Sequence, residues 1–262
     1  MGKFDGKVLA VAGGTSGINL GVAKHFAAEG AKVFTFSRDP EKVEAAVEAL
    51  RAIGPAAEGM SVDVRDYASV EAAFARCAEV FGPIDTLLSG AAGNFVAKAA
   101  DISSNGFRAV MEIDLLGTHH VMRAAGPHLR RPGANIINVT APQAQVAMVG
   151  QAHVCAAKAG VDMLTRAYAL EWGPEGIRVN AVSPGPIADT EGVRRLMSAE
   201  RLAQNEQSHI PLRRMGVIED VAELCAFLAS DAASWITGTV IPVDGGLLLN
   251  PTPHRMAEML EG

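Results

Sequence analysis

The chain has 262 residues, of which 49% are hydrophobic and 20% are charged. Such a composition provides the apolar side chains of a substantial core and excludes a chain that is disordered throughout. The formal net charge of −6 argues against non-specific binding to nucleic acid, so we expect no nucleic-acid partner.

The three cysteines, Cys77, Cys155 and Cys225, are far apart, and their spacing is not that of metal ligands. We therefore expect neither a disulfide framework nor a metal site. Small reduced thiols in helices are typical of a cytoplasmic protein. The chain shows no signal-peptide h-region, no peroxisomal tripeptide and no apolar run long enough to span a membrane. The expected location is the cytoplasm, with no membrane partner.

Short apolar runs alternate with amphipathic segments along the chain. Strands are predicted at Val8–Ala12, Lys32–Phe36, Ala57–Val62, Ile84–Leu88, Asn135–Val139, Ile177–Val182 and Val240–Val243. Helices are predicted at Gly17–Glu29, Pro40–Ile53, Tyr67–Phe81, Gly106–Leu129 and from about His153 to Trp172. Buried strands that are each followed by a helix predict an α/β fold over residues 1–262, with one doubly wound parallel sheet and helices on both faces. Residues 188–210 depart from this alternation and are predicted to form a lid over a substrate.

A glycine-containing turn follows the first strand and opens the first helix. Glycines let the backbone turn sharply and approach a pyrophosphate, which the N-terminus of the helix then attracts. The candidate cofactor-binding residues of this turn are Gly13, Thr15, Ser16, Gly17 and Ile18. A plain strand-to-helix loop is the alternative interpretation of this turn taken alone.

The order of motifs from Lys7 to Leu248 resembles that of the short-chain dehydrogenase/reductase family. Two positions of the first turn depart from the family pattern, since Ala12 replaces a threonine and Asn19 replaces a glycine. The resemblance implies a Rossmann-type sheet and a bound nicotinamide dinucleotide. The further cofactor-binding residues that it implies are Asp63, Val64, Gly90, Ala91, Thr140, Lys158, Pro184, Gly185, Ile187 and Thr190.

The end of the second strand bears on which dinucleotide is bound. An acidic residue there would bind the ribose 2′-hydroxyl of NAD. This strand is followed instead by Ser37 and Arg38, whose hydroxyl and guanidinium groups suit the 2′-phosphate of NADP(H). We therefore expect NADP(H). Asp39 lies one position further on, and a competing interpretation assigns it to the ribose.

The catalytic positions of the family are changed in this chain. The family uses an asparagine, a serine, a tyrosine and a lysine, and the corresponding residues here are Asp114, Ala141, Val154 and Lys158. A valine cannot transfer a proton. The resemblance implies that Lys158 still binds the nicotinamide ribose and favours negative charge that develops nearby.

The changed positions occur together with the segments Ala91–Phe95, Asn138–Ala141, Glu171–Pro174, Pro184–Ile187 and Thr190–Gly192. This combination resembles the 2,4-dienoyl-CoA reductases, especially the peroxisomal-type branch. That resemblance implies NADPH-dependent reduction of a conjugated dienoyl thioester to a 3-enoyl-CoA. It implies that Asp114 acts with a water as the proton source, and that Asn94, Phe95 and His153 contact the substrate. The implied small-molecule partner is an acyl-CoA thioester, and the implied assembly is a homotetramer.

Other interpretations remain open from the sequence. Asp114 is also compatible with a polar helix residue bonded to backbone. His153 lies five positions before Lys158, so the two point about 140° apart on a helix, which favours a pocket wall over an acid. Adjacent His119 and His120 face different sides, which favours helix packing over a metal site. The rival functions are another short-chain reductase or dehydrogenase and a catalytically inactive NADP-binding protein.

Overall fold

The apolar runs form one parallel sheet in the computed structural model, which describes residues 2–190 and 210–249. Its seven strands lie in the order β3-β2-β1-β4-β5-β6-β7. The strands are β1 (Val8–Ala12), β2 (Lys32–Ser37), β3 (Ala56–Ser61), β4 (Thr86–Ser89), β5 (Asn135–Val139), β6 (Arg178–Pro184) and β7 (Val240–Val243). Because β1 pairs with both β2 and β4, the strand order reverses beside it, and ligands of such sheets bind at the strand ends there.

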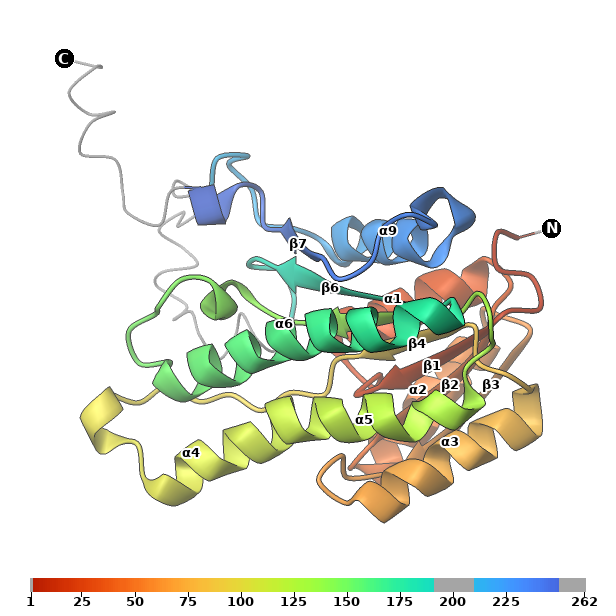
Figure 1. Cartoon of the computed structure of the whole chain (residues 1–262), viewed down its shortest axis with the longest axis horizontal. Helices are drawn as coiled ribbons and strands as arrows, with labels where there is room; N and C mark the ends of the chain where they lie inside the picture. The colour runs from red at the N-terminus through yellow and green to blue at the C-terminus, as the bar shows by residue number, and fades with distance from the viewer. Residues whose placement is uncertain (1, 191–209, 250–262) are drawn as a thin grey trace.

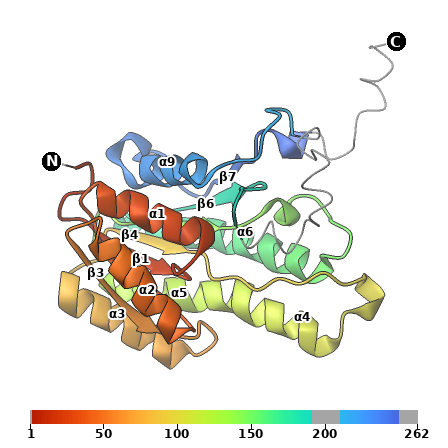
Figure 2. The same ribbon diagram turned by 180° about the vertical axis from the view of Figure 1, so that it is seen from behind.

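Helices cover both faces of the sheet. They are α1 (Gly17–Ala28), α2 (Pro40–Arg51), α3 (Tyr67–Phe81), α4 (Ser104–Val110), α5 (Gly117–Ala125), α6 (Ala152–Trp172) and α9 (Ile218–Ala229). Figure 1 shows α5 and α6 in front of the sheet, and the reverse view in Figure 2 shows α1 and α2 on the other side. None of the described helices is both long and apolar enough to cross a bilayer.

The alternation of side chains along the central strand creates two cores. Leu9 and Val11 of β1 point into the core under α1, α2 and α9. Val8 and Ala10 of the same strand point into the core that α3, α5 and α6 cover. Successive strand residues face opposite sides of a sheet, so a strand buried on both sides must be apolar throughout. This requirement explains the uninterrupted apolar run of β1.

The structure confirms the predicted fold class, a doubly wound parallel sheet with helices on both faces. The predicted strands all form, with ends shifted by two residues or fewer. Helix α9 is absent from the predicted elements. Of the predicted lid at 188–210, residues 191–209 lie outside the described part of the chain.

The predicted long helix over 106–129 is interrupted, which corrects the expectation of one regular helix. A π-helical turn, Met111–Leu116, separates α4 from α5. Each such turn contains one more residue per hydrogen-bonded ring than an α-helix, and these turns occur frequently at functional sites. Hydrophobic periodicity does not reveal such a turn, because it changes the helix for only a few residues.

A buried carboxylate fastens the amino-terminal edge of the sheet, away from the glycine turn. Asp85, 5% exposed, accepts hydrogen bonds from the Val8 amide, the Lys7 ammonium and the Arg130 guanidinium. Burial acts to raise the pKa of Asp85, but these hydrogen bonds outweigh it and hold the pKa below its usual value. Asp85 therefore stabilises the pairing of β1 with β4 in its ionised form.

Replacing Asp85 with Asn should lower the free energy of unfolding by about 1–2 kcal/mol at pH 7, since both cationic partners are half-exposed and screened by water. A lowered folded-state pKa gives stability that is present above the unfolded value of 3.8 and lost as the pH falls through the folded value. Urea unfolding should therefore show that the advantage of the native chain over Asp85→Asn is constant from pH 7 to about pH 5 and narrows as the pH falls below 3.8. The exposed control Asp101→Asn should match the native chain, and a loss independent of pH would contradict this account.

Candidate active site

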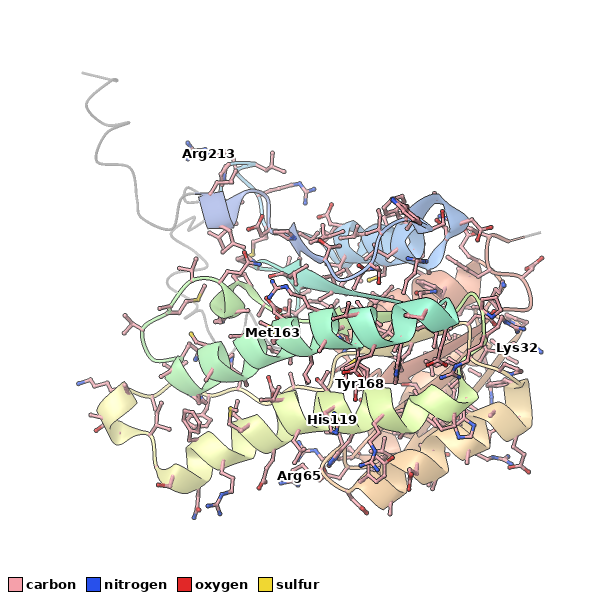
Figure 3. All side chains as sticks on the ribbon, in the orientation of Figure 1. Lys32, Arg65, His119, Met163, Tyr168 and Arg213 are labelled. Atoms are coloured by element: carbon pink, nitrogen blue, oxygen red, sulfur yellow. The ribbon has the colours of Figure 1, made fainter. Side chains whose placement is uncertain are left out.

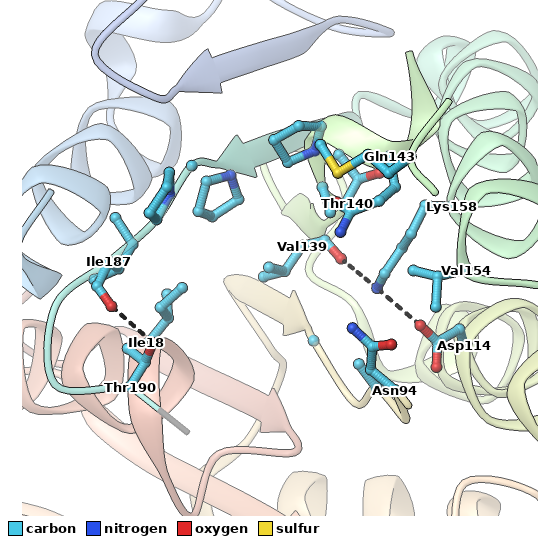
Figure 4. A pocket seen from close by; sticks show the side chains of 18 of the residues that line it. Ile18, Asn94, Asp114, Val139, Thr140, Gln143, Val154, Lys158, Ile187 and Thr190 are labelled. Carbon is cyan, nitrogen blue, oxygen red and sulfur yellow. Dashed lines mark hydrogen bonds and ion pairs between the residues drawn. The ribbon is translucent and has the colours of Figure 1, made fainter. Parts of the chain in front are cut away.

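Loops that follow the carboxyl ends of β1, β4, β5 and β6 line a cavity of about 490 Å³, called the main cavity below. Figure 4 shows this cavity from close by. The predicted residues that line it are Ile18, Gly90, Asn94, Asp114, Thr140, Lys158, Pro184, Gly185, Ile187 and Thr190. Residues from distant parts of the sequence therefore meet at the edge of the sheet where the fold favours ligand binding.

A buried ion pair lies in the wall of this cavity. Lys158 Nζ is 3.3 Å from Asp114 Oδ2, and the two side chains are 8% and 1% exposed. Lys158 also donates to the Val139 carbonyl oxygen at 3.2 Å, and Asp114 Oδ1 accepts from the Gly93 amide at 2.6 Å. Asp114 Oδ2 makes no hydrogen bond. The sequence also allowed Asp114 to be a polar helix residue that only bonds to backbone. That interpretation accounts for Oδ1 but not for Oδ2.

The local helix geometry accounts for the position of Asp114. The residue lies inside the π-helical turn and is buried, while Leu116 of the same turn is 43% exposed. On the facing element, Lys158 belongs to α6, which packs against this turn. Helix α6 thus brings the ammonium, and the π-helical turn brings the carboxylate, to the same wall.

The two positions at which the family has hydroxyl groups are apolar in this wall. Val154, 3% exposed, and Ala141 both line the cavity. Neither of the described tyrosines replaces them: Tyr168 bonds His119, and Tyr67 packs against His120 and Arg123. The missing proton donor at position 154 is therefore not supplied by either tyrosine.

A second cavity, of about 210 Å³, adjoins the first and shares Gly90 and Ala92 with it. It is narrower and has more polar lining. The predicted residues that line it are Gly13, Thr15, Ser16, Ser37, Arg38, Asp63, Val64, Gly90 and Ala91. The predicted cofactor residue that lines neither cavity is Gly17, which begins α1 with a positive φ of 53°. The two cavities therefore meet at the loop that follows β4.

The glycine turn has the geometry of a phosphate cradle. Gly13 has a φ of 75°, and a Cβ there would lie 2.9 Å from the Ala91 backbone, so a larger residue would not fit. Ser16 occupies the N-cap of α1, but its side chain makes no capping hydrogen bond. The first amides of α1 are therefore available to an anionic ligand.

Asn19, which replaces a family glycine, links the two sides of this cradle. Its Nδ2 donates to the Gly13 carbonyl at 3.2 Å and to the Gly90 carbonyl at 2.9 Å. Asn19 is 9% exposed, and a Cβ on Gly90 would lie 2.4 Å from its amide nitrogen. The substitution thus occupies the space that glycine would leave and ties the turn after β1 to the end of β4.

The charged residues near the predicted ribose site differ in the hydrogen bonds that their side chains make. Arg38 is exposed at the cavity; its backbone carbonyl accepts from the Ser61 hydroxyl, and its guanidinium makes no hydrogen bond within the described residues. The Asp39 carboxylate accepts from the amides of Glu41 and Lys42 as the N-cap of α2. Asp63 binds Arg65, whose hydrogen bonds hold the pKa of that carboxyl below its usual range.

The three residues predicted to contact substrate do not share one location. Asn94 lines the main cavity, and its Oδ1 is buried without a hydrogen bond. The Phe95 ring packs against His153 in a tilted arrangement, with 4.1 Å between ring centroids, and neither residue lines the cavity. His153 is fully buried, and neither of its ring nitrogens has a partner among the described residues. The substrate contacts of Phe95 and His153 remain predictions.

Another buried carboxyl lies one helical turn beyond Lys158. Asp162 is 4% exposed, and burial raises its pKa even though Thr140, Arg166 and Lys158 act to lower it. Asp162 was not selected from the sequence. Its spacing of four residues from Lys158 is the signal that could have found it, since such residues share a helix face.

The two adjacent histidines are held in place by different elements. His119 Nδ1 lies 3.0 Å from the Tyr168 hydroxyl of α6, and His120 Nδ1 lies 2.8 Å from the Val64 carbonyl oxygen. Figure 3 shows His119 and Tyr168 on the neighbouring helices α5 and α6. The described ranges contain no group of three or more histidine, cysteine or acidic residues that could hold a metal ion. A role of this helix face in a tetramer stays a prediction.

Comparison with known proteins agrees with this geometry. The family model described as Enoyl-(Acyl carrier protein) reductase matches residues 12–248. The chain therefore belongs to this short-chain dehydrogenase/reductase family. A short-chain type dehydrogenase/reductase from Mycobacterium ulcerans has a TM-score of 0.90 and 32% identity, covering 98% of this chain and 95% of its own. A Bacillus anthracis short chain dehydrogenase has a TM-score of 0.82 and 38% identity, with 95% and 99% covered.

Similar curated proteins carry more specific names. The Rattus norvegicus relative, a peroxisomal 2,4-dienoyl-CoA reductase [(3E)-enoyl-CoA-producing], is 39% identical, covering 97% of this chain and 88% of its own. The Arabidopsis thaliana protein of the same name is 36% identical, with 98% and 89% covered. A probable 2,4-dienoyl-CoA reductase [(2E)-enoyl-CoA-producing] from Bacillus subtilis is 38% identical, with 94% and 98% covered.

Replacing Asn19 with Asp should weaken dinucleotide binding about tenfold, because a carboxylate would face two carbonyl oxygens where an amide now donates. Titration of cofactor fluorescence measures the dissociation constant. Asn105→Asp, the same chemical change at an exposed site on α4, should bind like the native chain. Unchanged affinity in Asn19→Asp would show that the link does not shape the cradle.

Proposed function

We propose that this chain reduces a 2,4-dienoyl-CoA thioester with NADPH and forms a 3-enoyl-CoA. The observation that carries the proposal is the buried Asp114–Lys158 pair in a cavity wall where the usual hydroxyl positions are Ala141 and Val154. The names of the relatives agree with a dienoyl-CoA substrate. A carbonyl reductase of this family needs a proton donor at position 154, whereas the reduction of a conjugated thioester does not need a donor at that position.

The chemistry of a conjugated thioester explains why the phenol is dispensable. When bound, the reduced nicotinamide supplies a hydride to the far end of the diene. Negative charge then spreads onto the thioester oxygen, which needs hydrogen-bond donors nearby. Asp114 orients the water that delivers a proton to the carbon next to the thioester, and the Lys158 ammonium compensates the charge that develops beside it.

The residues of the two cavities fit a dinucleotide. The cradle at Gly13 admits no Cβ, and the first amides of α1 have no side-chain cap. These groups would hold the pyrophosphate, while Lys158 would hold the nicotinamide ribose next to the ion pair. Pro184, Gly185 and Ile187 also line the cavity and would contact the nicotinamide; Figure 4 shows Ile187 across the cavity from Lys158.

The preference for NADPH over NADH rests on the end of β2. Arg38 is exposed at the second cavity, where its guanidinium is available to a 2′-phosphate. Asp39 lines neither cavity, and its carboxylate is engaged through Oδ1 as the cap of α2. This engagement of Asp39 supports NADPH.

The native chain should oxidise NADPH in the presence of 2,4-hexadienoyl-CoA, and Asp114→Asn should lose at least about 100-fold in turnover, because the water loses its carboxylate. The dissociation constant of NADPH should stay within about twofold, since Asn retains the acceptor for the Gly93 amide. Glu112→Gln, a carboxylate of the same turn outside the cavity, is the control. If the chain turns over only other carbonyl or enoyl substrates, it is a different reductase. If it binds the cofactor but turns over none of these substrates, it is an inactive protein.

Replacing Arg38 with Ala should lower the ratio of kcat/KM for NADPH over NADH by about 10- to 100-fold, because a hydrogen bond to a charged group contributes about that factor to binding. Steady-state kinetics with both cofactors measures this ratio. The exposed Arg108→Ala variant of α4 should leave it unchanged. A native preference for NADH would instead support Asp39 as the ribose ligand.

A further inference from the structure

The polar side chains of the main cavity differ in whether the protein already satisfies them. Asp114 and Lys158 bind each other and backbone groups, and the Thr190 hydroxyl donates to the Ile187 carbonyl oxygen. Gln143 lines the same cavity and is only 9% exposed. No hydrogen bond joins its side chain to any residue in the described ranges. A primary amide, with two donors and an acceptor, is thus left for a ligand.

The side chain of Gln143 lines the cavity, and its amide is not fully shielded. Asn94 Oδ1 is fully shielded and has no hydrogen-bond partner. The Gln143 Oε1 and Nε2 atoms, in contrast, are not fully shielded. Burying an amide without a partner is unfavourable, so a residue of this kind is expected to bond to what fills the cavity. This observation distinguishes Gln143 from the apolar residues around it.

The backbone fixes where this amide lies. Ala141 leaves β5 in an extended conformation, with a φ of −159°, and Pro142–Ala144 form a 3₁₀ turn that packs against α6. Figure 4 shows Gln143 on the side of the cavity that carries Lys158 and Val154, away from Ile18. Gln143 therefore belongs to the wall that would face the substrate, opposite the wall assigned to the nicotinamide.

The same wall contains the two positions from which the family's hydroxyl groups are missing. The side chains of Ala141 and Val154 have no hydrogen-bond donor for a carbonyl oxygen. We propose that Gln143 Nε2 donates a hydrogen bond to the thioester carbonyl oxygen of the acyl-CoA substrate. This inference rests on the proposed function and identifies the donor that the reaction needs.

The donor acts where charge develops. Hydride addition at the δ carbon shifts the γ–δ π pair to the β–γ bond and the α–β π pair to the bond between the α carbon and the carbonyl carbon. The carbonyl π pair moves onto the thioester oxygen. The Gln143 amide bonds more strongly to that negative oxygen than to the neutral carbonyl, so it stabilises the transition state. The electron pair returns when the α carbon gains a proton, and the product is the β,γ-unsaturated thioester.

Kinetics of Gln143→Leu and Gln143→Glu with 2,4-hexadienoyl-CoA test this role. Gln143→Leu should lose about 100- to 1000-fold in kcat/KM, mostly in kcat, as for one lost oxyanion donor. Gln143→Glu should lose more, because it places negative charge against the oxygen, and NADPH affinity should stay native in both. The exposed Gln145→Leu of the same loop is the control. Native kinetics in Gln143→Leu, or an equal loss of NADPH affinity, would overturn the inference.

A binding measurement separates this inference from the proposed function. Hexanoyl-CoA labelled with carbon-13 at the carbonyl cannot be reduced, and its infrared carbonyl band reports hydrogen bonding in the complex with NADP⁺. The band should lie at lower wavenumber in the native complex than in Gln143→Leu, even if the native chain reduces no dienoyl-CoA. Identical bands would overturn the role of Gln143 while dienoyl-CoA turnover stands. A native chain that binds no acyl-CoA would refute both.

Discussion

The buried pair of Asp114 and Lys158 is the interaction on which the rest of the site depends. Removing two opposite charges from water is costly, and their attraction compensates only when the geometry is fixed and further hydrogen bonds are made. The protein fixes it from three elements: the Gly93 amide, the Val139 carbonyl and the π-helical turn that carries Asp114. A site with this arrangement keeps a charged pair ready beside a mostly apolar cavity.

The cradle and the ion pair are joined through a short series of contacts. Asn19 bonds the carbonyl oxygens of Gly13 and Gly90, and the same loop continues to Gly93, whose amide bonds Asp114. The glycine turn that would hold a pyrophosphate is thereby placed relative to the carboxylate that would serve the substrate. Placing two reactants in one geometry is a large part of what such a site contributes to a rate.

The fold and much of the site follow from local sequence. Short apolar strands, helix starts such as Pro40 and the glycine turn each depend on neighbouring residues, so their positions are predictable. Features that depend on distant residues are not predictable in this way. The Asn19 link needs Gly90, 71 positions away, and the contact of the Phe95 ring with His153 needs two elements to meet. The direction of Gln143 likewise depends on how the turn after β5 packs.

The strand order has a consequence for how the chain is made. The central strand β1 pairs with β4, and Val8 bonds Asp85 across 77 positions. A growing chain therefore finishes β1, β2 and β3 while one side of β1 still lacks its neighbour. Such an open strand edge is a template for pairing with other chains until β4 is synthesised, and parallel pairing over this separation is slow. The same arrangement that sets the ligand cleft beside β1 thus makes the first third of the chain the part most in need of protection during synthesis.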